Sequence, residues 1–219
     1  MYLFTGICSK GLGAVQAERR KTSLRATRTK LLQAAVYVFS RKGYRAASTR
    51  DIARRAKVNQ VTLFRLFKGK AGLRAAVVDY MFANINFRDR LAPRLERPLD
   101  GPQFIQVVID TLLEALYASP DFYRIIVYSA LENDPKTMRA VWRELKPAYT
   151  LAASHLEDRI RSGQFRKVNS LVAVRLMTAA AFHHYRIYEL FQGKKVPGFR
   201  SRGWSRQCAD IIYRGLKAG

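Results

Sequence analysis

Hydrophobic side chains recur every three or four residues over most of the chain, which is the spacing of helices that bury one face. The first such stretch carries Leu31, Ala35 and Phe39, and Gly43 follows it, so the pattern predicts a helix over about residues 27–42. No segment alternates strictly between apolar and polar residues, as a half-buried strand would. We therefore expect an all-α fold.

Two short helices are expected next, each with its own capping residue. Ser48 has the side chain of a helix N-cap, and Asp51 follows three residues later, a spacing similar to that of a capping box. Asn59 offers a second N-cap, ahead of an apolar run that ends at Phe67. Because only the tight segment 56–58 separates the two helices, the arrangement predicts a helix-turn-helix.

The rest of the chain is also helical in pattern. A longer helix is expected from Ala71 towards Asn86, and the prolines between positions 93 and 102 then indicate a linker. Pro147 is expected to kink or split the helix that contains it. The remaining helices are predicted over residues 103–118, 121–132, 136–162, 168–192 and 204–217.

These patterns divide the chain into an arm and two domains. Residues 1–25 mix Gly, Ser, Lys and Arg with little periodicity and predict a flexible basic N-terminal arm. Residues 26–73 form the expected helix-turn-helix domain, and residues 74–219 form a larger helical C-terminal domain.

Positive charge is concentrated in the N-terminal third. The 219 residues include 40 Lys and Arg against 16 Asp and Glu, a formal net charge of +24. Residues 1–75 hold 18 of the basic and 2 of the acidic residues, a net charge of +16. Such a balance favours polyanionic partners, nucleic acid before an anionic membrane. Solvated helix faces can also collect positive charge, so motifs must decide between these explanations.

Several classes of protein are not indicated. Cys8 and Cys208 are too few and too far apart for a disulfide framework, which fits a reducing cytoplasm. No stretch reaches the roughly 20 apolar residues of a membrane span, so we expect a cytoplasmic protein without a membrane partner. The adjacent His183 and His184 point about 100° apart on a helix and do not chelate one metal ion together. No motif of an enzyme or a cofactor site is present, so neither activity nor cofactor is expected.

Residues 27–73 carry the functional signal. They run TRTKLLQAAVYVFSRKGYRAASTRDIARRAKVNQVTLFRLFKGKAGL. The ordered fragments are the Ala-Ala and Phe face, Lys-Gly-Tyr, Ser-Thr before Asp-Ile-Ala, Val-Asn before Thr-Leu-Phe, and Phe-Lys-Gly-Lys. This set resembles the TetR family of transcriptional repressors. The resemblance implies that the helix-turn-helix binds double-stranded DNA and that the C-terminal domain is regulatory.

The second helix of such a motif enters the major groove with its exposed N-terminal side chains. Gln60 can pair with adenine, and Arg65 can reach guanine or a phosphate. Val61 or the methyl group of Thr62 can contact a thymine methyl. These four residues are therefore the candidate base readers.

Phosphate contacts are expected around them. Thr49 and Arg50 lie in the first turn of the preceding helix, where a hydroxyl, free backbone N–H groups and a guanidinium suit a phosphate. The resemblance makes Lys70 a phosphate-clamping lysine. Arg28, at the start of the first helix, is a further candidate clamp.

Three positions depart from the family pattern. Lys57 stands where the turn usually has glycine, so a non-glycine residue must adopt the turn conformation at some cost. Phe64 stands where a phosphate-contacting tyrosine is usual, and Leu66 where an aromatic residue or histidine is common. Phe64 stays in the candidate DNA-binding set, but two polar contacts are lost there, which additional lysines and arginines can replace.

The resemblance implies that the last two long helices of the C-terminal domain form a homodimer and that the domain encloses a pocket for a small-molecule effector. The helix from Leu171 to Phe191 has an apolar face broad enough for a partner helix, although an internal core would need the same face. Aromatic residues could line a pocket or fill a core. The candidate pocket residues are Tyr123, Trp142, Tyr149, His183 and Tyr188.

Two hypotheses about function follow. The first is a TetR-like regulator, a dimeric repressor that an effector releases from a palindromic operator. The second is a nonspecific architectural DNA-binding protein whose positive charge dominates. Salt dependence and sequence preference distinguish them, because a purely electrostatic binder loses affinity with salt on every sequence.

Overall fold

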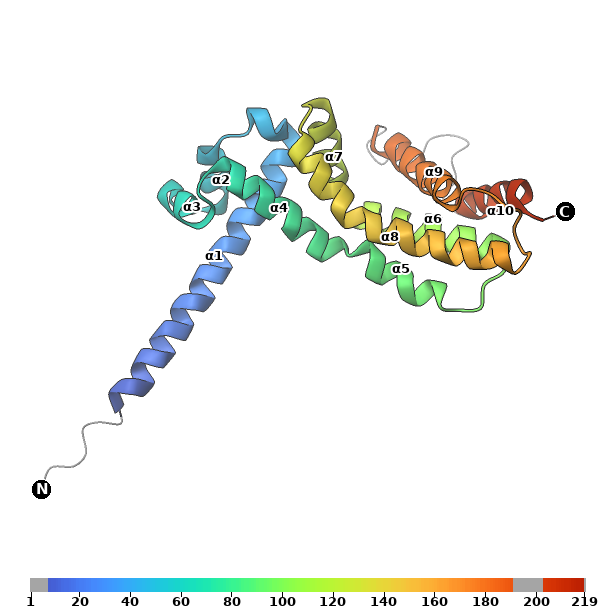
Figure 1. Cartoon of the computed structure of the whole chain (residues 1–219). Coiled ribbons are helices and arrows are strands. Elements are labelled where there is room, and N and C mark those ends of the chain that lie inside the picture. The colour runs from blue at the N-terminus through green and yellow to red at the C-terminus, as the bar shows by residue number, and fades with distance from the viewer. Residues whose placement is uncertain (1–7, 191–202, 219) are drawn as a thin grey trace, which may run out of the picture.

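The computed structural model describes residues 8–190 and 203–218, which form ten α-helices (Figure 1). The all-α expectation is confirmed: within the described ranges no strand occurs, and a single antiparallel bridge joins Phe165 to Lys217. None of the helices in these ranges is long and apolar enough to cross a membrane. The helices are α1 (Cys8–Ala46), α2 (Thr49–Ala56), α3 (Gln60–Phe67), α4 (Lys70–Ile85), α5 (Phe87–Leu95), α6 (Gly101–Ala118), α7 (Pro120–Leu131), α8 (Pro135–Arg161), α9 (Ser170–Leu190) and α10 (Trp204–Leu216).

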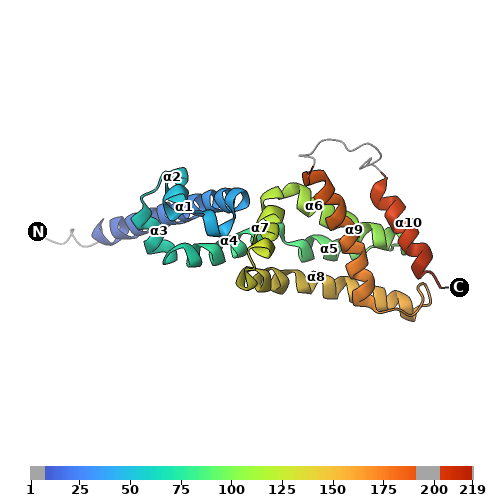
Figure 2. The same ribbon diagram turned by 90° about the horizontal axis from the view of Figure 1, so that it is seen from above.

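The molecule is elongated, with a small N-terminal bundle at one end and a larger C-terminal bundle at the other (Figure 2). In the small bundle α2 and α4 pack against α1, and α3 packs against α2 and α4; α4 then leads into the larger bundle (Figure 1). Helix α6 is central to the C-terminal bundle, where it packs against α5, α7, α9 and α10. Phe104, Ile105 and Ile109 of α6 are completely buried, as expected for a helix at the centre of that core.

The two bundles meet at Gly43, where α1 passes the end of α7. Gly43 has φ 73° and ψ 172°, and a Cβ atom there would overlap the carboxylate of Glu132. That carboxylate accepts hydrogen bonds from the backbone N–H groups of Tyr44 (3.2 Å) and Arg45 (3.0 Å). The Arg45 guanidinium in turn donates to the backbone oxygen of Glu132 at 2.8 Å. Hydrogen bonds therefore connect the kink in α1 directly to the turn that follows α7.

A second set of polar contacts joins α4 to the start of α8. Arg74 Nη1 lies 2.6 Å from Asp134 Oδ2, and Asp134 is only 8% exposed. Asp134 also caps α8, because its carboxylate accepts from the backbone N–H and the hydroxyl of Thr137. Because these buried charges are paired and hydrogen-bonded, they fix the position of α4 relative to the start of α8.

The first helix begins much earlier than the pattern predicted. Residues 8–25, expected to be part of a flexible arm, continue α1 as a helix that projects from the small bundle (Figure 1). No Gly or Pro occurs between residues 14 and 42, and a packed helix already exists at its C-terminal end. Adding residues to an existing helix avoids the cost of nucleation, so composition alone was a poor guide. Residues 1–7 lie outside the described ranges.

The linker expected around the prolines is also partly wrong. Phe87, Leu91 and Leu95 are spaced four residues apart, and all three are buried on one side of α5. Burying each contributes about 1.5–3 kcal/mol, which together exceeds the ~3 kcal/mol cost of Pro93 inside the helix. Helix α8 likewise runs through Pro147 as one helix and does not split.

Candidate nucleic-acid interface

Helices α2 and α3 are fixed at their ends by the residues that the sequence predicted. Ser48 Oγ accepts a hydrogen bond from the backbone N–H of Asp51 at 3.0 Å, and Asn59 Oδ1 accepts from that of Val61 at 2.8 Å. Lys57 adopts the left-handed conformation, with φ 55° and ψ 43°, and its N–H bonds back to Arg54 O. The turn therefore has its usual shape although lysine replaces glycine there.

A small apolar core sets the angle of α3. Ile52 of α2 and Leu63 of α3 are completely buried, and Phe67 closes the core from the end of α3. Phe39 of α1 packs edge-on against Tyr44, with the ring centroids 5.7 Å apart. Apart from the half-buried Tyr44, these side chains are buried, so their role is to hold α3 with its opposite face outward.

The outward face of α3 presents three of the candidate contacts. Val61 is 72% exposed, Phe64 is 47% exposed, and Arg65 is exposed as well. The expectation that Gln60 and Thr62 are equally exposed was wrong, because both are half-buried. A half-buried side chain at these two positions can adopt fewer orientations towards a base than a fully exposed side chain.

Gln60 is held by a partner on the neighbouring helix. Its Nε2 donates to Thr49 Oγ1 at 2.8 Å, so a candidate base reader and a candidate phosphate contact form one pair. The sequence does not indicate this pair, because 11 positions separate the two residues along the chain. Their link orients the Gln60 amide at the first turn of α3.

The two remaining clamp candidates differ in availability. Arg28 is exposed on α1, and its guanidinium lies 5.2 Å from the ring centroid of Phe67. Lys70 turns inward: its Nζ donates to the backbone oxygen of Arg45 at 3.0 Å and lies 4.5 Å from the centroid of the Tyr44 ring. Burial lowers the pKa of Lys70, and the nearby Glu132 carboxylate partly offsets that effect. Lys70 would have to exchange these contacts for a phosphate.

One basic cluster was missed from the sequence. The guanidinium groups of Arg41 and Arg55 lie 3.7 Å and 3.1 Å from the ring centroid of Tyr37. The spacing of Tyr37 and Arg41 by four residues could have indicated half of it, but Arg55 comes from α2. The cluster adds positive charge to the side of the bundle where α1 and α2 meet.

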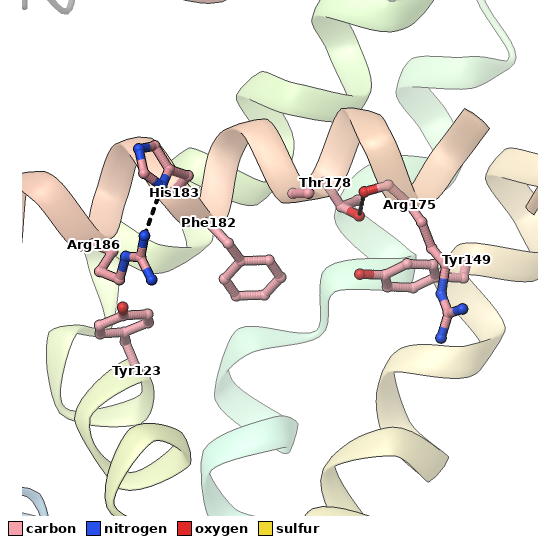
Figure 3. A pocket seen from close by; sticks show the side chains of 8 residues that line it. Tyr123, Tyr149, Arg175, Thr178, Phe182, His183 and Arg186 are labelled. Carbon is pink, nitrogen blue, oxygen red and sulfur yellow. Dashed lines mark hydrogen bonds between the residues drawn. The ribbon is translucent and has the colours of Figure 1, made fainter. Parts of the chain in front are cut away.

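The C-terminal bundle contains a separate cavity of about 510 Å³ between α7, α8 and α9 (Figure 3). Of the candidate pocket residues, Tyr123, Tyr149 and His183 line it, together with Arg175, Phe182 and Arg186. Trp142 and Tyr188 do not line it. Trp142 packs against Tyr149 at 5.7 Å between ring centroids, and Tyr188 packs against Tyr117 at 5.0 Å.

The two adjacent histidines have different environments, as their helical spacing predicted. His183 is exposed and lies 2.8 Å from Arg186 Nη2, whereas His184 is buried and stacks on Trp204 at 4.1 Å. Burial lowers the pKa of His184, and His183 adds to that effect. Among the described residues no three His, Cys, Asp or Glu side chains gather closely enough to hold a metal ion.

Comparison with known proteins agrees with the helix-turn-helix geometry. The family model described as bacterial regulatory proteins of the tetR family matches residues 31–77, which span the second half of α1 through the first half of α4. Residues 31–77 are a DNA-binding domain of the TetR family. The match identifies a transcriptional regulator of this type, as the resemblance to TetR repressors implied.

The relatives of this chain match it over different lengths. The regulator YvkB of Bacillus subtilis is 41% identical over 61 residues, which cover 28% of this chain and 32% of YvkB. The repressor NicS of Pseudomonas putida is 25% identical over 91% of this chain and 99% of NicS. The match to YvkB has the higher identity but is short, whereas the match to NicS covers nearly the full length at lower identity.

Solved TetR-family structures share the whole fold. A regulator from Mesorhizobium loti superimposes with a TM-score of 0.65 at 19% identity, covering 88% of this chain and 95% of that one. FadR of Bacillus subtilis, solved in complex with stearoyl-CoA, gives a TM-score of 0.66 at 14% identity, covering 85% of this chain and 95% of FadR. At such low identity these likenesses establish the fold alone.

Proposed function

We propose that this chain is a repressor that binds a palindromic operator as a homodimer and leaves it when a small molecule fills the C-terminal cavity. The observation that carries the proposal is the outward face of α3, capped and packed so that Val61 and Arg65 project from the small bundle. Residues 26–73 would bind DNA, and residues 74–219 would dimerise and bind the effector. The similarity to the repressor NicS supports repression.

Base recognition would combine a rigid and a mobile part. The bond between Gln60 and Thr49 restricts the amide that would pair with adenine. Arg65 carries no such restraint among the described contacts and can adapt to guanine or to a phosphate. Preorganised side chains lose less entropy on binding. We therefore assign most of the sequence preference to Gln60, whereas Arg65 can adjust to different bases or phosphates.

Dimerisation is supported by an apolar surface on the last two described helices. Leu171, Val172 and Leu176 of α9 are 50%, 62% and 55% exposed, and Ile211 of α10 is 69% exposed. Single exposed apolar residues are common, but a group on two adjacent helices marks an interaction surface. A second copy of the chain with the same surface would cover it. Phe191, which the sequence analysis assigned to this face, lies outside the described residues.

The cavity supports an effector with an anionic group and an apolar body. Arg175 and Arg186 contribute two positive charges to its lining, and none of the described residues that line it is acidic. Tyr123, Tyr149 and Phe182 supply aromatic surface (Figure 3). FadR, whose structure contains stearoyl-CoA, supports the idea that this fold accepts organic anions.

An architectural DNA-binding protein is the competing proposal, and the net charge of +24 favours it. Selection of bound fragments from genomic DNA at about 0.15 M salt distinguishes the two, because weak phosphate contacts are screened at that concentration. We expect one short palindrome to be enriched. The double variant Gln60→Ala, Arg65→Ala should lose this enrichment while its binding to random DNA changes little. Recovery of unselected DNA by the unmodified protein would favour the architectural proposal.

A further inference from the structure

The projecting half of α1 is a basic helix that no other part of the described chain covers (Figure 1). Every described side chain from Gln16 to Ala26 is exposed. Residues 16–30 contain one acidic residue, Glu18. Their basic residues are Arg19, Arg20, Lys21, Arg25, Arg28 and Lys30. A helix that buries no face gains little from its own chain, so a partner would contribute to holding it.

Three of the basic residues share one face of this helix. Lys21, Arg25 and Arg28 are separated by four and three residues, the spacing of neighbours along one side. The same spacing leads on to Leu32 and Phe39, which are 2% and 3% exposed in the core of the small bundle. The face that packs against the bundle therefore continues beyond it as a basic face.

This basic face lies on the α3 side of α1. The Arg28 guanidinium is 5.2 Å from the ring centroid of Phe67, the last residue of α3. Both views place α3 and the projecting half of α1 at the same end of the molecule, away from α9 and α10 (Figures 1 and 2). DNA held by α3 would therefore lie close to Lys21 and Arg25.

We propose that Lys21 and Arg25, with Arg28, form a second DNA contact that binds phosphates flanking the half-site contacted by α3. The inference rests on the proposed DNA-binding function. From Arg28 to Gln16 the helix extends about 18 Å, and a duplex carries one phosphate for about every 1.7 Å of its axis, so phosphates are within reach of each side chain. Leu24 is the one large apolar side chain described between positions 18 and 30, so a polyanion fits this surface better than an apolar protein partner.

Two matched double variants of the full chain test the proposal. Lys21→Gln, Arg25→Gln removes two charges from the α3-facing side, and Arg19→Gln, Lys30→Gln removes two from the opposite side of the same helix. Gln is a good helix former, and all four side chains are exposed, so both variants should fold. Affinity for the selected operator and for random duplexes is measured by fluorescence anisotropy over a series of salt concentrations.

We expect the Lys21, Arg25 variant to bind roughly tenfold or more weakly at 0.15 M salt, on both kinds of duplex. The slope of log affinity against log salt should be shallower by about 1.8 per bound protomer, since each phosphate contact contributes about 0.9. The control should show less than half of each change, and the preference for operator over random DNA should persist in both variants.

Equal effects of the two variants would overturn the proposal, because they would indicate a general charge effect without a docked face. Unchanged DNA binding in both variants, or a loss confined to binding of anionic lipid vesicles, would also overturn it. If the unmodified protein has no preferred sequence, the slopes on random duplexes still test this contact separately from the regulator proposal.

Discussion

Gly43 has a backbone conformation that residues with a side chain rarely adopt. Its φ of 73° and ψ of 172° fall in a region that is essentially restricted to glycine. The carboxylate of Glu132 also occupies the space that a Cβ atom would need. Conformation and contact thus require glycine independently, at the point where the DNA-binding bundle meets the C-terminal bundle.

Gly43→Ala should therefore lower the free energy of unfolding by about 2–4 kcal/mol, from backbone strain and the displaced Glu132. Chemical denaturation followed by circular dichroism measures this. Gly163→Ala is the matched control, because Gly163 also has a positive φ, 77°, but nothing lies within 4 Å of its Cβ position. It should cost about 1–2 kcal/mol less than Gly43→Ala. Equal losses would mean that the contact with Glu132 has no influence.

At the same scale, the sequence predicted only in part which candidate DNA-contacting side chains are exposed and which already have partners within the protein. Val61 and Arg65 are exposed as their positions on α3 suggested. The half-buried Gln60 and the inward-turned Lys70 depend on Thr49 Oγ1 and the backbone oxygen of Arg45. Such contacts arise where separate helices meet, and no local spacing encodes them.

Helix ends were predicted well where the signal is local. Ser48 and Asn59 cap the helices as expected, because each bonds to an N–H two or three residues away. The start of α1 and the existence of α5 differ from the prediction, because helix continuity and burial outweigh the composition of residues 8–25 and the presence of Pro93. The buried residues Phe87, Leu91 and Leu95, four apart, would have revealed α5 in spite of Pro93.

The start of α8 depends on an ion pair with α4. Asp134→Asn should destabilise the protein by about 3 kcal/mol at neutral pH, because it leaves the 17%-exposed Arg74 side chain without its charge partner. Asp158→Asn removes the carboxylate of an exposed pair with Arg161 and should cost less than about 1 kcal/mol. Urea unfolding of the two variants compares them directly. Similar losses would contradict a special role for the buried pair.

The same pair predicts how stability depends on pH. Burial raises the pKa of Asp134, but hydrogen bonds from Thr137 and the charge of Arg74 outweigh it and hold the pKa below its usual value. A lowered folded-state pKa stabilises the protein above the unfolded pKa of about 3.9, and this stability is lost as the pH falls through the folded value. We expect the difference in unfolding free energy between the unmodified protein and Asp134→Asn to shrink below about pH 4. A constant difference down to pH 2 would contradict the assignment.

At the scale of the whole molecule, the two bundles are joined by polar contacts near Gly43 and Asp134. Glu132 and Asp134 lie at the turn between α7 and α8, and these two helices also contribute Tyr123 and Tyr149 to the lining of the cavity. Movement of α7 against α8 on filling that cavity would be transmitted to α1 and α4 through these contacts. An effector can shift DNA affinity only by its differential affinity for the two arrangements, so this turn is where the difference should be expressed.

Dimerisation should decide how tightly the whole molecule holds an operator. Leu176→Glu places a charge in the exposed apolar surface of α9, so we expect a shift from dimer to monomer in analytical ultracentrifugation. Binding to a full palindrome should weaken roughly 100-fold, because the second half-site no longer benefits from a linked partner, while binding to an isolated half-site stays unchanged. Leu131→Glu is the control: Leu131 is an equally apolar side chain, 74% exposed, and it ends α7 and belongs to neither α9 nor α10. If both variants remain dimers with unchanged affinity, the apolar surface of α9 is not the dimer interface.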